Sequence, residues 1–455
     1  MKKFFCTFFL CLLAAVTLSV SARAAEDILK VGLYYGSTAL PAANLENHTG
    51  SGYALGWFDE DIRAFHQIDY TSERKLTIRA AGRSLQVTAT DTGEALFAFD
   101  CSGGRYLGIM PDGQGAKAQT WCKGYRWYGG FEYRPDGSGV SVTNVVSLED
   151  YVKGVLPYEM SPVWPLEALK AQAVCARTYA LLPSRHYAKD RFDLCNSDCC
   201  QVYRGVNLSS AATDQAVEET AGMVAFYNGK YAETYYCSSN GGASESSVNI
   251  WLNHQPYLVG KPDPYEKLTD IPDYEYTIHY SWKELTALLA KRGYAIGTVT
   301  SAQVTKTTPV GNVSEITFRD ASGKTAVLTK EDCRWALNAK SMRFTITGGS
   351  GAGGWSVNRS GEKLSSLSDA YVLSRTGLAG SLDAGSAYVI TASGTSPLQT
   401  AGVASGGDGI TVTGTGWGHG VGMSQYGAKA MAEQGHPYQD ILEFYYTGIQ
   451  LQRIG

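Results

Sequence analysis

The chain has 455 residues, of which 18% are charged, and its formal net charge is −4 at pH 7. A nucleic-acid-binding protein needs a basic face, so this charge balance favours no nucleic-acid partner. The length is enough for two or three domains, or for one elaborated domain. High counts of glycine (51) and tyrosine (29) are typical of a β-rich secreted protein that handles polar polymers such as glycans.

The first residues have the pattern of a secretory signal peptide. Two lysines precede an apolar run, and Ala22-Arg23-Ala24 fits a cleavage site. We therefore expect residues 1–24 to be removed and the mature chain to be exported across the cytoplasmic membrane, to the extracellular space or the cell wall. If the segment is not cleaved, it would anchor the chain in the membrane.

The region that follows, residues 25–140, has short alternating apolar runs separated by Gly, Asp and Asn. This pattern predicts β-strands and no long helix. A hairpin is predicted at Pro135-Asp136-Gly137.

Helical signals begin at Ser147, which with Asp150 resembles a capping box. This first helix should be short and should stop before Pro157, because a proline disfavours helical backbone in the residue before it. A second helix is predicted to begin at Pro165 and to end at Pro183.

The rest of the chain mixes hairpins, one helix and loops. A hairpin should turn at Asn228-Gly229, "SWKELTALLAKRGY" should be a helix, and "VSEITFRDASGKTAVLTKEDC" should be another hairpin. Two Gly/Ser-rich stretches, "TGGSGAGGW" and "TASGTSPLQTAGVASGGDG", have the composition of loops or linkers. A last helix is expected from about Ser424. The predicted class is α+β, β-rich, with a few helices flanking a glycan-binding cleft.

A lone acid, Glu159, lies between Pro157 and Pro162 among bulky apolar residues. Burial disfavours a carboxylate, so we expect the pKa of Glu159 to be raised. A carboxylic acid that is neutral near pH 7 can act as a general acid in glycosidic cleavage. From these residues alone, an exposed or helix-capping turn glutamate is the simpler interpretation. Arg177, on the following helix, could pair with a carboxylate or contact an anionic substrate group.

Four potential metal ligands are crowded into fifteen positions: His186, Cys195, Cys199 and Cys200. Four nitrogen and sulfur ligands satisfy tetrahedral Zn²⁺ and leave no open position, so such a site would be structural. The alternative is a disulfide, for example between Cys195 and Cys199 or Cys200, which an exported protein can form.

Two later segments carry groups that suit glycan binding. A polar turn could bind sugar hydroxyl and acetamido groups through Ser238, Ser239, Asn240 and Gly241. In the glycine-rich "GTGWGHGVGMSQYGA", Trp417 could stack on a sugar, and His419 could orient a catalytic group or bond to the backbone. Cys237 could also be a nucleophile with His419 as its base, although a buried inert cysteine is the simpler interpretation.

Several of these segments resemble one family when they are taken in order. They are "LEDYVKGVLPYEMSPVWPLEALKAQAVCARTYAL", "DLCNSDCCQVYRG", "YYCSSNGGASESS", "GWGHGVGMSQYGA" and "ILEFYYTGIQL". Together they are similar to the SpoIID/LytB family of peptidoglycan enzymes related to stage II sporulation protein D. The resemblance covers residues 141–455, with a less recognisable middle at about 265–410.

This resemblance implies an exported lytic transglycosylase that cuts the bond between N-acetylmuramic acid and N-acetylglucosamine and leaves a 1,6-anhydro end. Glu159 would act first as acid and then as base, with Arg177 supporting the site. The resemblance also implies cell-wall remodelling, including in sporulation, with peptidoglycan strands stripped of stem peptides as substrate. Residues placed near the glycan by the resemblance are Gln201, Tyr203 and Gln425.

The family resemblance also bears on cofactors and partners. Some members bind zinc near this position, where Cys199 stands in place of a common histidine. No organic cofactor is expected. The alternative function is a non-catalytic cell-wall binding module that enhances a partner amidase.

Overall fold

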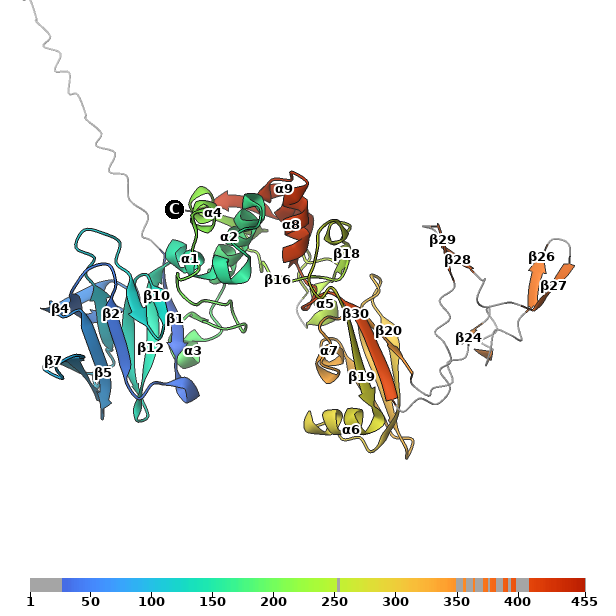
Figure 1. The fold of residues 1–455 in the computed structure, drawn as a ribbon, viewed down its shortest axis with the longest axis horizontal. Helices are drawn as coiled ribbons and strands as arrows, with labels where there is room; N and C mark the ends of the chain where they lie inside the picture. The colour runs from blue at the N-terminus through green and yellow to red at the C-terminus, as the bar shows by residue number, and fades with distance from the viewer. Residues whose placement is uncertain are drawn as a thin grey trace, which may run out of the picture.

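The computed structural model describes residues 27–251, 254–348 and 409–454, together with the backbone of short strands between 355 and 397. It confirms the predicted α+β, β-rich class. Figure 1 shows an N-terminal β-sandwich in blue, a helical layer in green and red, and a second β-rich lobe in yellow and orange. The predicted signal peptide lies outside the described residues, as do most of the two Gly/Ser-rich stretches.

The N-terminal β-sandwich consists of two sheets. The seven-stranded sheet has the order β13 (Leu194–Cys195), β1 (Ile28–Tyr34), β12 (Gly139–Ser147), β11 (Gly130–Asp136), β8 (Leu107–Pro111), β3 (Tyr53–Phe58) and β4 (Phe65–Thr71). The six-stranded sheet has the order β10 (Tyr125–Trp127), β9 (Thr120–Cys122), β2 (Ala43–Asn47), β5 (Lys75–Ala81), β6 (Ser84–Ala89) and β7 (Ala95–Asp100). A short 3-10 turn, Gly36–Thr38, follows β1.

The strands of the sandwich alternate in burial, as expected when one face of each sheet is packed on the other. Leu76 and Ile78 of β5 face Val140 and Val142 of β12 across the interior, and all four side chains are fully buried. The predicted hairpin at residues 135–137 is present, with Gly137 at φ +60°. The predicted boundary at residue 140 falls inside β12, so the last strand of the sandwich continues directly into the first helix.

The helical layer is built around one central helix, α2. Its helices are α1 (Leu148–Glu159), α2 (Leu166–Ala180), α3 (Tyr187–Asp190), α4 (Ala211–Glu219), α8 (Gln425–Glu433) and α9 (Tyr438–Tyr445). Helices α1, α4, α8 and α9 all pack on α2. A three-stranded sheet borders them, in the order β15 (Lys230–Tyr231), β14 (Met223–Tyr227) and β32 (Gln450–Arg453). Its hairpin turns at Asn228-Gly229 as predicted.

Helix α1 differs from the prediction, because it continues through Pro157 to Glu159. Proline has no N–H to donate to the carbonyl of Lys153, one turn earlier. That carbonyl instead accepts a hydrogen bond from Ser209 Oγ at 3.3 Å. Since the proline lies in the last turn and the freed acceptor has a partner, the helix continues and carries Glu159 at its end.

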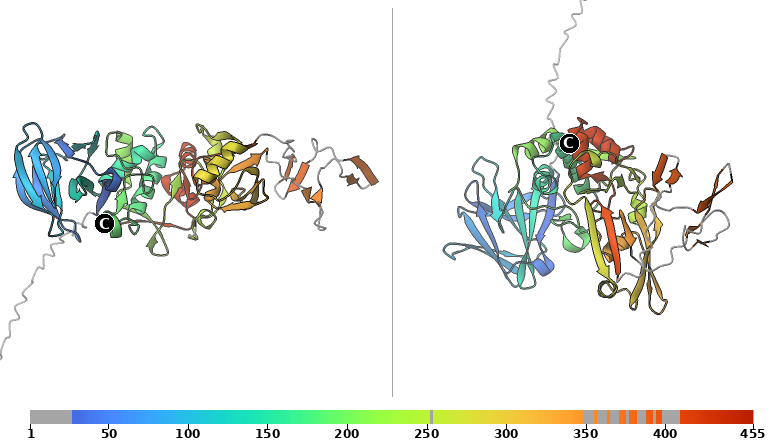
Figure 2. Two further views of the ribbon diagram at one scale, coloured as in Figure 1. Left: turned by 90° about the horizontal axis from the view of Figure 1, so that it is seen from below. Right: turned by 45° about the vertical axis from the view of Figure 1, so that its right-hand side comes forward.

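The second lobe is inserted between the polar turn and the glycine-rich segment. One of its sheets has the order β19 (Glu275–Ser281), β30 (Gly409–Thr415) and β23 (Phe344–Thr347). The other has the order β20 (Val299–Thr307), β21 (Val313–Asp320) and β22 (Thr325–Thr329). The lobe also contains the helices α6 (Trp282–Lys291) and α7 (Asp332–Ala336). The helix and hairpin predicted here are therefore confirmed. In Figure 2 the sandwich, the helical layer and this lobe follow one another along the long axis.

Short elements connect the helical layer with the second lobe. They are β16 (Tyr236–Cys237) paired with β31 (Met423–Ser424), β17 (Ala243–Ser244) paired with β18 (Lys261–Pro262), α5 (Ser247–Ile250) and the 3-10 turn Glu266–Leu268. Backbone hairpins also lie between residues 355 and 397: β24 (Trp355–Ser356) with β25 (Lys363–Leu364), β26 (Tyr371–Ser374) with β27 (Gly377–Ser381), and β28 (Tyr388–Thr391) with β29 (Gly394–Pro397).

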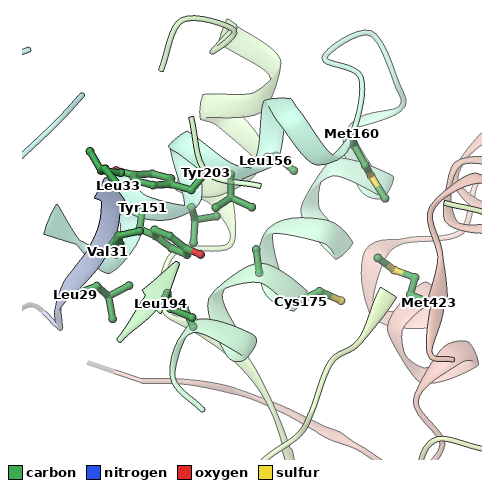
Figure 3. Close-up of a cluster of buried hydrophobic side chains, with 14 of the residues drawn as sticks. Leu29, Val31, Leu33, Tyr151, Leu156, Met160, Cys175, Leu194, Tyr203 and Met423 are labelled. Atoms are coloured by element: carbon green, nitrogen blue, oxygen red, sulfur yellow. The ribbon is translucent and has the colours of Figure 1, made fainter. Parts of the chain in front are cut away.

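One apolar cluster joins the sandwich to the helical layer. Figure 3 shows it running from Val31 of β1 through Tyr151 and Leu156 of α1 to Cys175 of α2 and Met423 of β31. Burial of this continuous surface fixes the position of α1 relative to both neighbours. Among the described residues, the helices are all too short or too polar to cross a membrane.

Candidate active site around Glu159

Three segments that are far apart in sequence meet at Glu159, the last residue of α1. Val202 donates its backbone N–H to Glu159 Oε1 at 2.9 Å. Gln425, the first residue of α8, donates from Nε2 to the backbone carbonyl of Glu159 at 3.0 Å. Tyr236 of β16 forms a side-chain hydrogen bond with the carboxyl group. These three segments therefore meet at Glu159 in the fold.

The environment of the Glu159 carboxyl group favours its protonated form. Burial raises the pKa of Glu159, and hydrogen bonds from Val202, Tyr236 and Gln425 oppose that rise only in part. All three opposing groups are uncharged. Within the described residues, neither a cation nor a second carboxylate contributes to the shift in the pKa of Glu159. The carboxyl group is thus held in a neutral, half-buried environment at the end of a helix.

Tyr236 and Gln201 form a hydrogen-bonded chain behind Glu159. The Tyr236 hydroxyl donates to Gln201 Oε1 at 3.1 Å. Gln201 is buried, and its Nε2 donates to the Tyr151 hydroxyl and to the Ala176 carbonyl, both at 3.2 Å, which fixes the amide orientation. A hydroxyl that gives its one proton to Gln201 can accept a proton from a protonated Glu159. Gln201, predicted to bind substrate, therefore positions Tyr236 instead of contacting solvent.

His419 is tied to the backbone through both ring nitrogens. Its Nδ1 accepts the N–H of Val421 at 3.0 Å, and the backbone of Tyr236 bonds to the other side of the ring. Burial, helped by the charge of Arg334, lowers the pKa of His419 to about 4. The ring is therefore neutral at physiological pH and holds the residue that contacts Glu159.

Cys237 lies next to His419 in the fold but is an inert thiol. Burial raises its pKa to about 12, so the thiolate is absent near pH 7. Both ring nitrogens of His419 are already bonded to the backbone. The arrangement does not support the alternative of a cysteine nucleophile with a histidine base.

The predicted polar turn is folded inward onto two buried carboxylates. Ser239 Oγ donates to Glu266 Oε2 at 3.0 Å, and the Asn240 N–H donates to Glu266 Oε1 at 2.6 Å. Asn240 Nδ2 donates to Asp263 Oδ2 at 2.8 Å. Gly241 has φ +74°, and a Cβ there would lie 2.5 Å from the Thr415 carbonyl, so glycine is required. Ser239, Asn240 and Gly241 therefore shape the turn rather than offering free groups to a sugar.

Two other predicted binding residues remain accessible beside this turn. Trp417 is 52% exposed and pairs with Ser239 through both backbone groups, at 3.0 and 2.9 Å. Lys340 Nζ lies 4.7 Å from the centroid of the Trp417 ring. Ser238 is half-buried, and its carbonyl accepts the Tyr426 N–H at 3.1 Å. An exposed indole beside this polar turn is suited to stacking on a sugar face.

Arg177 is not in contact with Glu159. It is fully buried, and its Nε and Nη2 bind the two carboxylate oxygens of Glu149 at 2.8 and 2.7 Å. Glu149 and Glu159 are ten positions apart on α1, which corresponds to about 15 Å along the helix. Arg177 also donates to the Met223 carbonyl at 3.1 Å. It therefore acts as a positioning residue that fixes the start of α1 against α2 and β14.

Tyr203 is also placed in the core, contrary to its predicted contact with the glycan. It is 1% exposed, and its hydroxyl donates to Asn144 Oδ1 at 2.6 Å. Its ring lies 4.8 Å from that of Tyr151, inside the cluster of Figure 3, and a Cβ on Gly154 would clash with it at 2.4 Å. A ring enclosed in this way has no surface to offer a substrate.

The four predicted metal ligands come together in one cluster. The ligand atoms of His186, Cys195, Cys199 and Cys200 all lie within 4.8 Å of one another. His186 Nδ1 lies 3.2 Å from Asp190 Oδ2, which leaves Nε2 facing Cys199 at 3.8 Å. A carboxylate behind a histidine is the usual outer partner of a zinc ligand. The eight cysteines of the described residues are free thiols, so no disulfide joins this cluster.

One cavity in the described part of the structure lies apart from Glu159. It has a volume of about 400 Å³ between the sandwich and helices α1 and α4. Its walls include Phe58, Met110 and Val217, with Lys117 and Lys153 beside them. Glu159 is not among the lining residues, so this cavity and the carboxyl group are separate features.

Sequence analysis missed three groups that surround Glu159 or support its surroundings. Val202 acts through its backbone, which no side-chain motif can reveal. Tyr236 is part of the recognised "YYCSSNGGASESS", but no role was predicted for its hydroxyl, because its contact with Glu159 depends on the tertiary fold. Glu266 has no local signal, because its role depends on three segments that meet only in the fold.

The sequence is similar to that of known proteins over most of its length. The profile of a family described as SpoIID, stage II sporulation protein, matches residues 136–227. An uncharacterised protein of Brachyspira hyodysenteriae is 33% identical over 335 residues, which is 72% of this chain and 73% of that protein. Stage II sporulation protein D of Bacillus amyloliquefaciens is 30% identical over 331 residues, 69% of this chain and 76% of that protein.

A third relative has a different name. The amidase enhancer of Bacillus subtilis is 32% identical over 310 residues, which is 66% of this chain but only 40% of that longer protein. The family profile covers α1 with Glu159 and α2, and the matches to full relatives extend over most of both chains. The chain therefore belongs to the SpoIID (stage II sporulation protein D) family.

Proposed function

We propose that this protein is an exported lytic transglycosylase of peptidoglycan, with Glu159 as its only catalytic acid and base. The observation that carries the proposal is the Glu159 carboxyl group, whose pKa is raised by burial and which has uncharged hydrogen-bond partners. The exposed Trp417, which pairs with Ser239 of the polar turn, supplies a surface for stacking on a sugar. Relatives named for sporulation support a role in cell-wall remodelling.

In the proposed reaction, Glu159 gives its proton to the glycosidic oxygen between N-acetylmuramic acid and N-acetylglucosamine, and the C1–O bond breaks. The resulting carboxylate takes the proton of the C6 hydroxyl of the same muramic acid, whose oxygen attacks C1 and closes the 1,6-anhydro ring. Glu159 ends protonated, as it began. Hydrolysis needs a second carboxylate to activate water or to act as nucleophile, whereas this route does not.

The His186 and Cys195/Cys199/Cys200 cluster fits Zn²⁺ by the chemistry of its donor set, and we propose that it holds a structural zinc ion. One histidine and three cysteines fill a tetrahedral shell, with Asp190 orienting His186. When bound, zinc would supply rigidity and no reactive position. Cys200 lies two positions before Val202, so the ion would stabilise the loop whose N–H binds Glu159.

A second candidate function is a non-catalytic cell-wall binding module that enhances a partner amidase. The similarity to the amidase enhancer of Bacillus subtilis favours it. Such a module needs the exposed Trp417 but has no need for a buried acid at residue 159. The two functions therefore differ in what they require of Glu159.

The test is digestion of purified glycan strands by the wild type, Glu159→Gln and a control, Glu218→Gln. Glu218 is an exposed residue of α4 that pairs with Lys153. We expect 1,6-anhydro ends, detected by mass spectrometry, from the wild type and the control but not from Glu159→Gln. General acid catalysis contributes about 10²–10⁴-fold, so the loss should be close to complete. Wild type without anhydro products, or a glutamine variant with equal yield, would exclude the proposed activity.

A further inference from the structure

Gln172 is a fully buried amide of α2, the helix against which α8 packs. Its neighbours along the helix, Ala171 and Ala173, are fully buried as well. Gln172 Oε1 accepts an N–H from Gln425 Nε2, the first residue of α8, at 3.4 Å. The same Nε2 atom donates to the backbone carbonyl of Glu159 at 3.0 Å. One amide of α8 therefore joins the central helix to the residue that carries the proposed acid.

The orientation of the two amides follows from the groups around them. A backbone carbonyl can only accept a hydrogen bond, so the nitrogen of Gln425 must face the carbonyl oxygen of Glu159. Gln172 must then present its oxygen to that nitrogen, because two N–H groups would otherwise face each other. The Gln172 nitrogen is consequently directed elsewhere, and it has no hydrogen-bond partner in the described part of the protein.

An unpaired amide nitrogen at residue 172 is unfavourable for folding. A buried donor without an acceptor has lost its hydrogen bonds to water and gained none in return. Methionine has a similar length and could fill the same space without this cost. Proteins keep such unfavourable polar groups mainly at functional sites, which points to a role for the paired oxygen of Gln172. Full burial excludes contact between Gln172 and a substrate, so that role must act through Gln425.

Gln425 has two amide N–H groups and three acceptors around it. The acceptors are the Glu159 carbonyl, Gln172 Oε1 and the Glu159 carboxyl group, with which the Gln425 side chain also forms a hydrogen bond. The carbonyl accepts one N–H, so Gln172 and the carboxyl group compete for the other. The bond to the carboxyl group favours its ionised form and lowers the pKa of Glu159. A bond from Gln425 to Gln172 instead leaves the protonated form favoured.

We propose that Gln172 is a positioning residue whose oxygen holds the second N–H of Gln425 away from the Glu159 carboxyl group, so that the acid keeps its proton until it meets the glycosidic oxygen. The inference rests on the proposed function, because it assigns a role in the protonation of Glu159. Once Glu159 has given up its proton, its carboxylate is a stronger acceptor than Gln172, and the same N–H turns to it. Gln425 thus stabilises the carboxylate that later takes the proton of the C6 hydroxyl.

The experiment measures the pKa of Glu159 directly, by NMR titration of full-length protein labelled at its glutamate carboxyl carbons. The Glu159 signal is identified by its absence from Glu159→Gln. The variants are Gln172→Met, Gln425→Met and the double variant, with Thr120→Val in β9 of the sandwich as a matched control. Thr120 is also fully buried, and its Oγ1 also has no partner among the described residues. The control therefore removes an unpaired buried polar group that has no part in the proposed site.

We expect opposite shifts from the two single variants. Gln172→Met should lower the pKa of Glu159, because Gln425 then donates both N–H groups to that residue, and one neutral hydrogen bond corresponds to about threefold to tenfold in proton affinity. Gln425→Met should raise the pKa, and the double variant should match it, since Gln172 acts only through Gln425. Thr120→Val should leave the pKa unchanged. Tyr236, the titratable group that also bonds to the Glu159 carboxyl, stays neutral because burial raises its pKa.

Thermal unfolding and the pH profile of kcat/KM on purified glycan strands give two further readouts. Gln172→Met and Thr120→Val should both keep or raise Tm, because each removes an unpaired buried group. Of these two variants, only Gln172→Met should move the alkaline limb of the kcat/KM profile to lower pH, because Glu159 then loses its proton more easily. A merely structural residue would lower Tm and leave the pH profile in place.

A conservative variant, Gln172→Glu, tests the oxygen of residue 172 separately from its nitrogen. At about pH 5 the carboxyl group that this substitution introduces should be neutral, because burial raises its pKa. It then keeps the acceptor oxygen for Gln425, so activity at that pH should match the wild type. Loss of activity there would overturn the role of the oxygen, even if Gln172→Met failed to fold.

The outcomes separate this inference from the proposed function. A Glu159 pKa that is unchanged or raised in Gln172→Met, or single shifts that add up in the double variant, would overturn the role of Gln172 even if the wild type produces anhydro ends. A wild type that forms no anhydro ends would overturn the proposed activity. The NMR titration needs no cleavage, so it would still show whether Gln172 controls the proton on Glu159.

Discussion

Replacement of Glu159 by glutamine should make the folded protein more stable at neutral pH, although it removes the proposed catalytic group. Burial raises the pKa of Glu159, so an ionised carboxylate is less favourable in the folded chain than in the unfolded chain. Glutamine is close in shape, carries no charge, and keeps an oxygen that can accept the Val202 N–H. At neutral pH the wild type must either bury a charged carboxylate or keep a proton on Glu159, and both cost folding free energy. The glutamine variant has neither cost.

The sign and size of the effect follow from proton linkage. Below the ordinary pKa of glutamate, about 4.3, both the folded and the unfolded chain carry the proton, and the two proteins should be equally stable. As the pH rises through the raised folded pKa, the wild type loses stability and the variant does not. A tenfold difference in proton affinity corresponds to about 1.4 kcal/mol. Because three hydrogen bonds oppose the burial effect, we expect a gain on the order of 1 kcal/mol at pH 7.

The assay is thermal unfolding of both proteins from pH 4 to pH 8. A gain of this size corresponds to a Tm increase of roughly 2–4 °C, growing with pH and then levelling off. Glu218→Gln is the control of opposite sign, because Lys153 lowers the pKa of Glu218. The Glu218→Gln variant should therefore be less stable than the wild type at neutral pH. A Glu159→Gln variant that is less stable than the wild type at pH 7, or whose difference does not change with pH, would refute a buried, proton-retaining acid.

Two further predictions concern groups that support the site. Replacing Arg177 by methionine should lower the free energy of unfolding by about 3 kcal/mol or more, measured by denaturant titration, because Glu149 loses its charged partner and buried carbonyls lose a donor. A loss below about 1 kcal/mol would contradict this structural role. Protein purified without chelator or added metal should contain one zinc ion per chain. Cys199→Ser should lower both the zinc content and Tm. The control Cys333→Ser, in the second lobe, should leave the zinc content unchanged. Zinc-free protein with a Cys195 disulfide would contradict the metal proposal.

Local sequence patterns predicted the elements well wherever one signal decided the structure. Asn228-Gly229 gave the hairpin turn, because both residues adopt positive φ there, +48° and +75°. The predicted end of α1 was wrong because the prediction considered only the effect of Pro157 on its own helix. The Ser209 hydroxyl that compensates for it belongs to the loop before α4, far from Pro157 in sequence. A rule based on neighbouring residues cannot take account of such a distant hydrogen-bond partner.

The burial of Glu159 could be predicted from the sequence, but the positions of the residues around it could not. The prolines and aromatic residues near Glu159 correctly indicated burial, which depends on near neighbours. The contact predicted for Tyr203 was not reproduced, because its direction depends on how the loop after Val202 packs on Gly154. The family resemblance placed Arg177 at the Glu159 site, whereas its pairing with Glu149 depends on how α1 and α2 cross in the fold. Residue type indicated the chemistry, and tertiary packing decided which residue performs it.

The N-terminal sandwich is part of the framework that keeps the pKa of Glu159 raised. A buried acid retains its raised pKa only while the loop covering it stays in place. That loop is held at its start where Cys195 of β13 pairs with Gly32 of β1, and further on by the Tyr203 hydroxyl on Asn144 of β12. Cys199 and Cys200, two of the proposed zinc ligands, lie between these two anchors in the sequence. A change that loosens the sandwich should therefore admit water to Glu159, lower its pKa and reduce the fraction of enzyme able to donate a proton at pH 7.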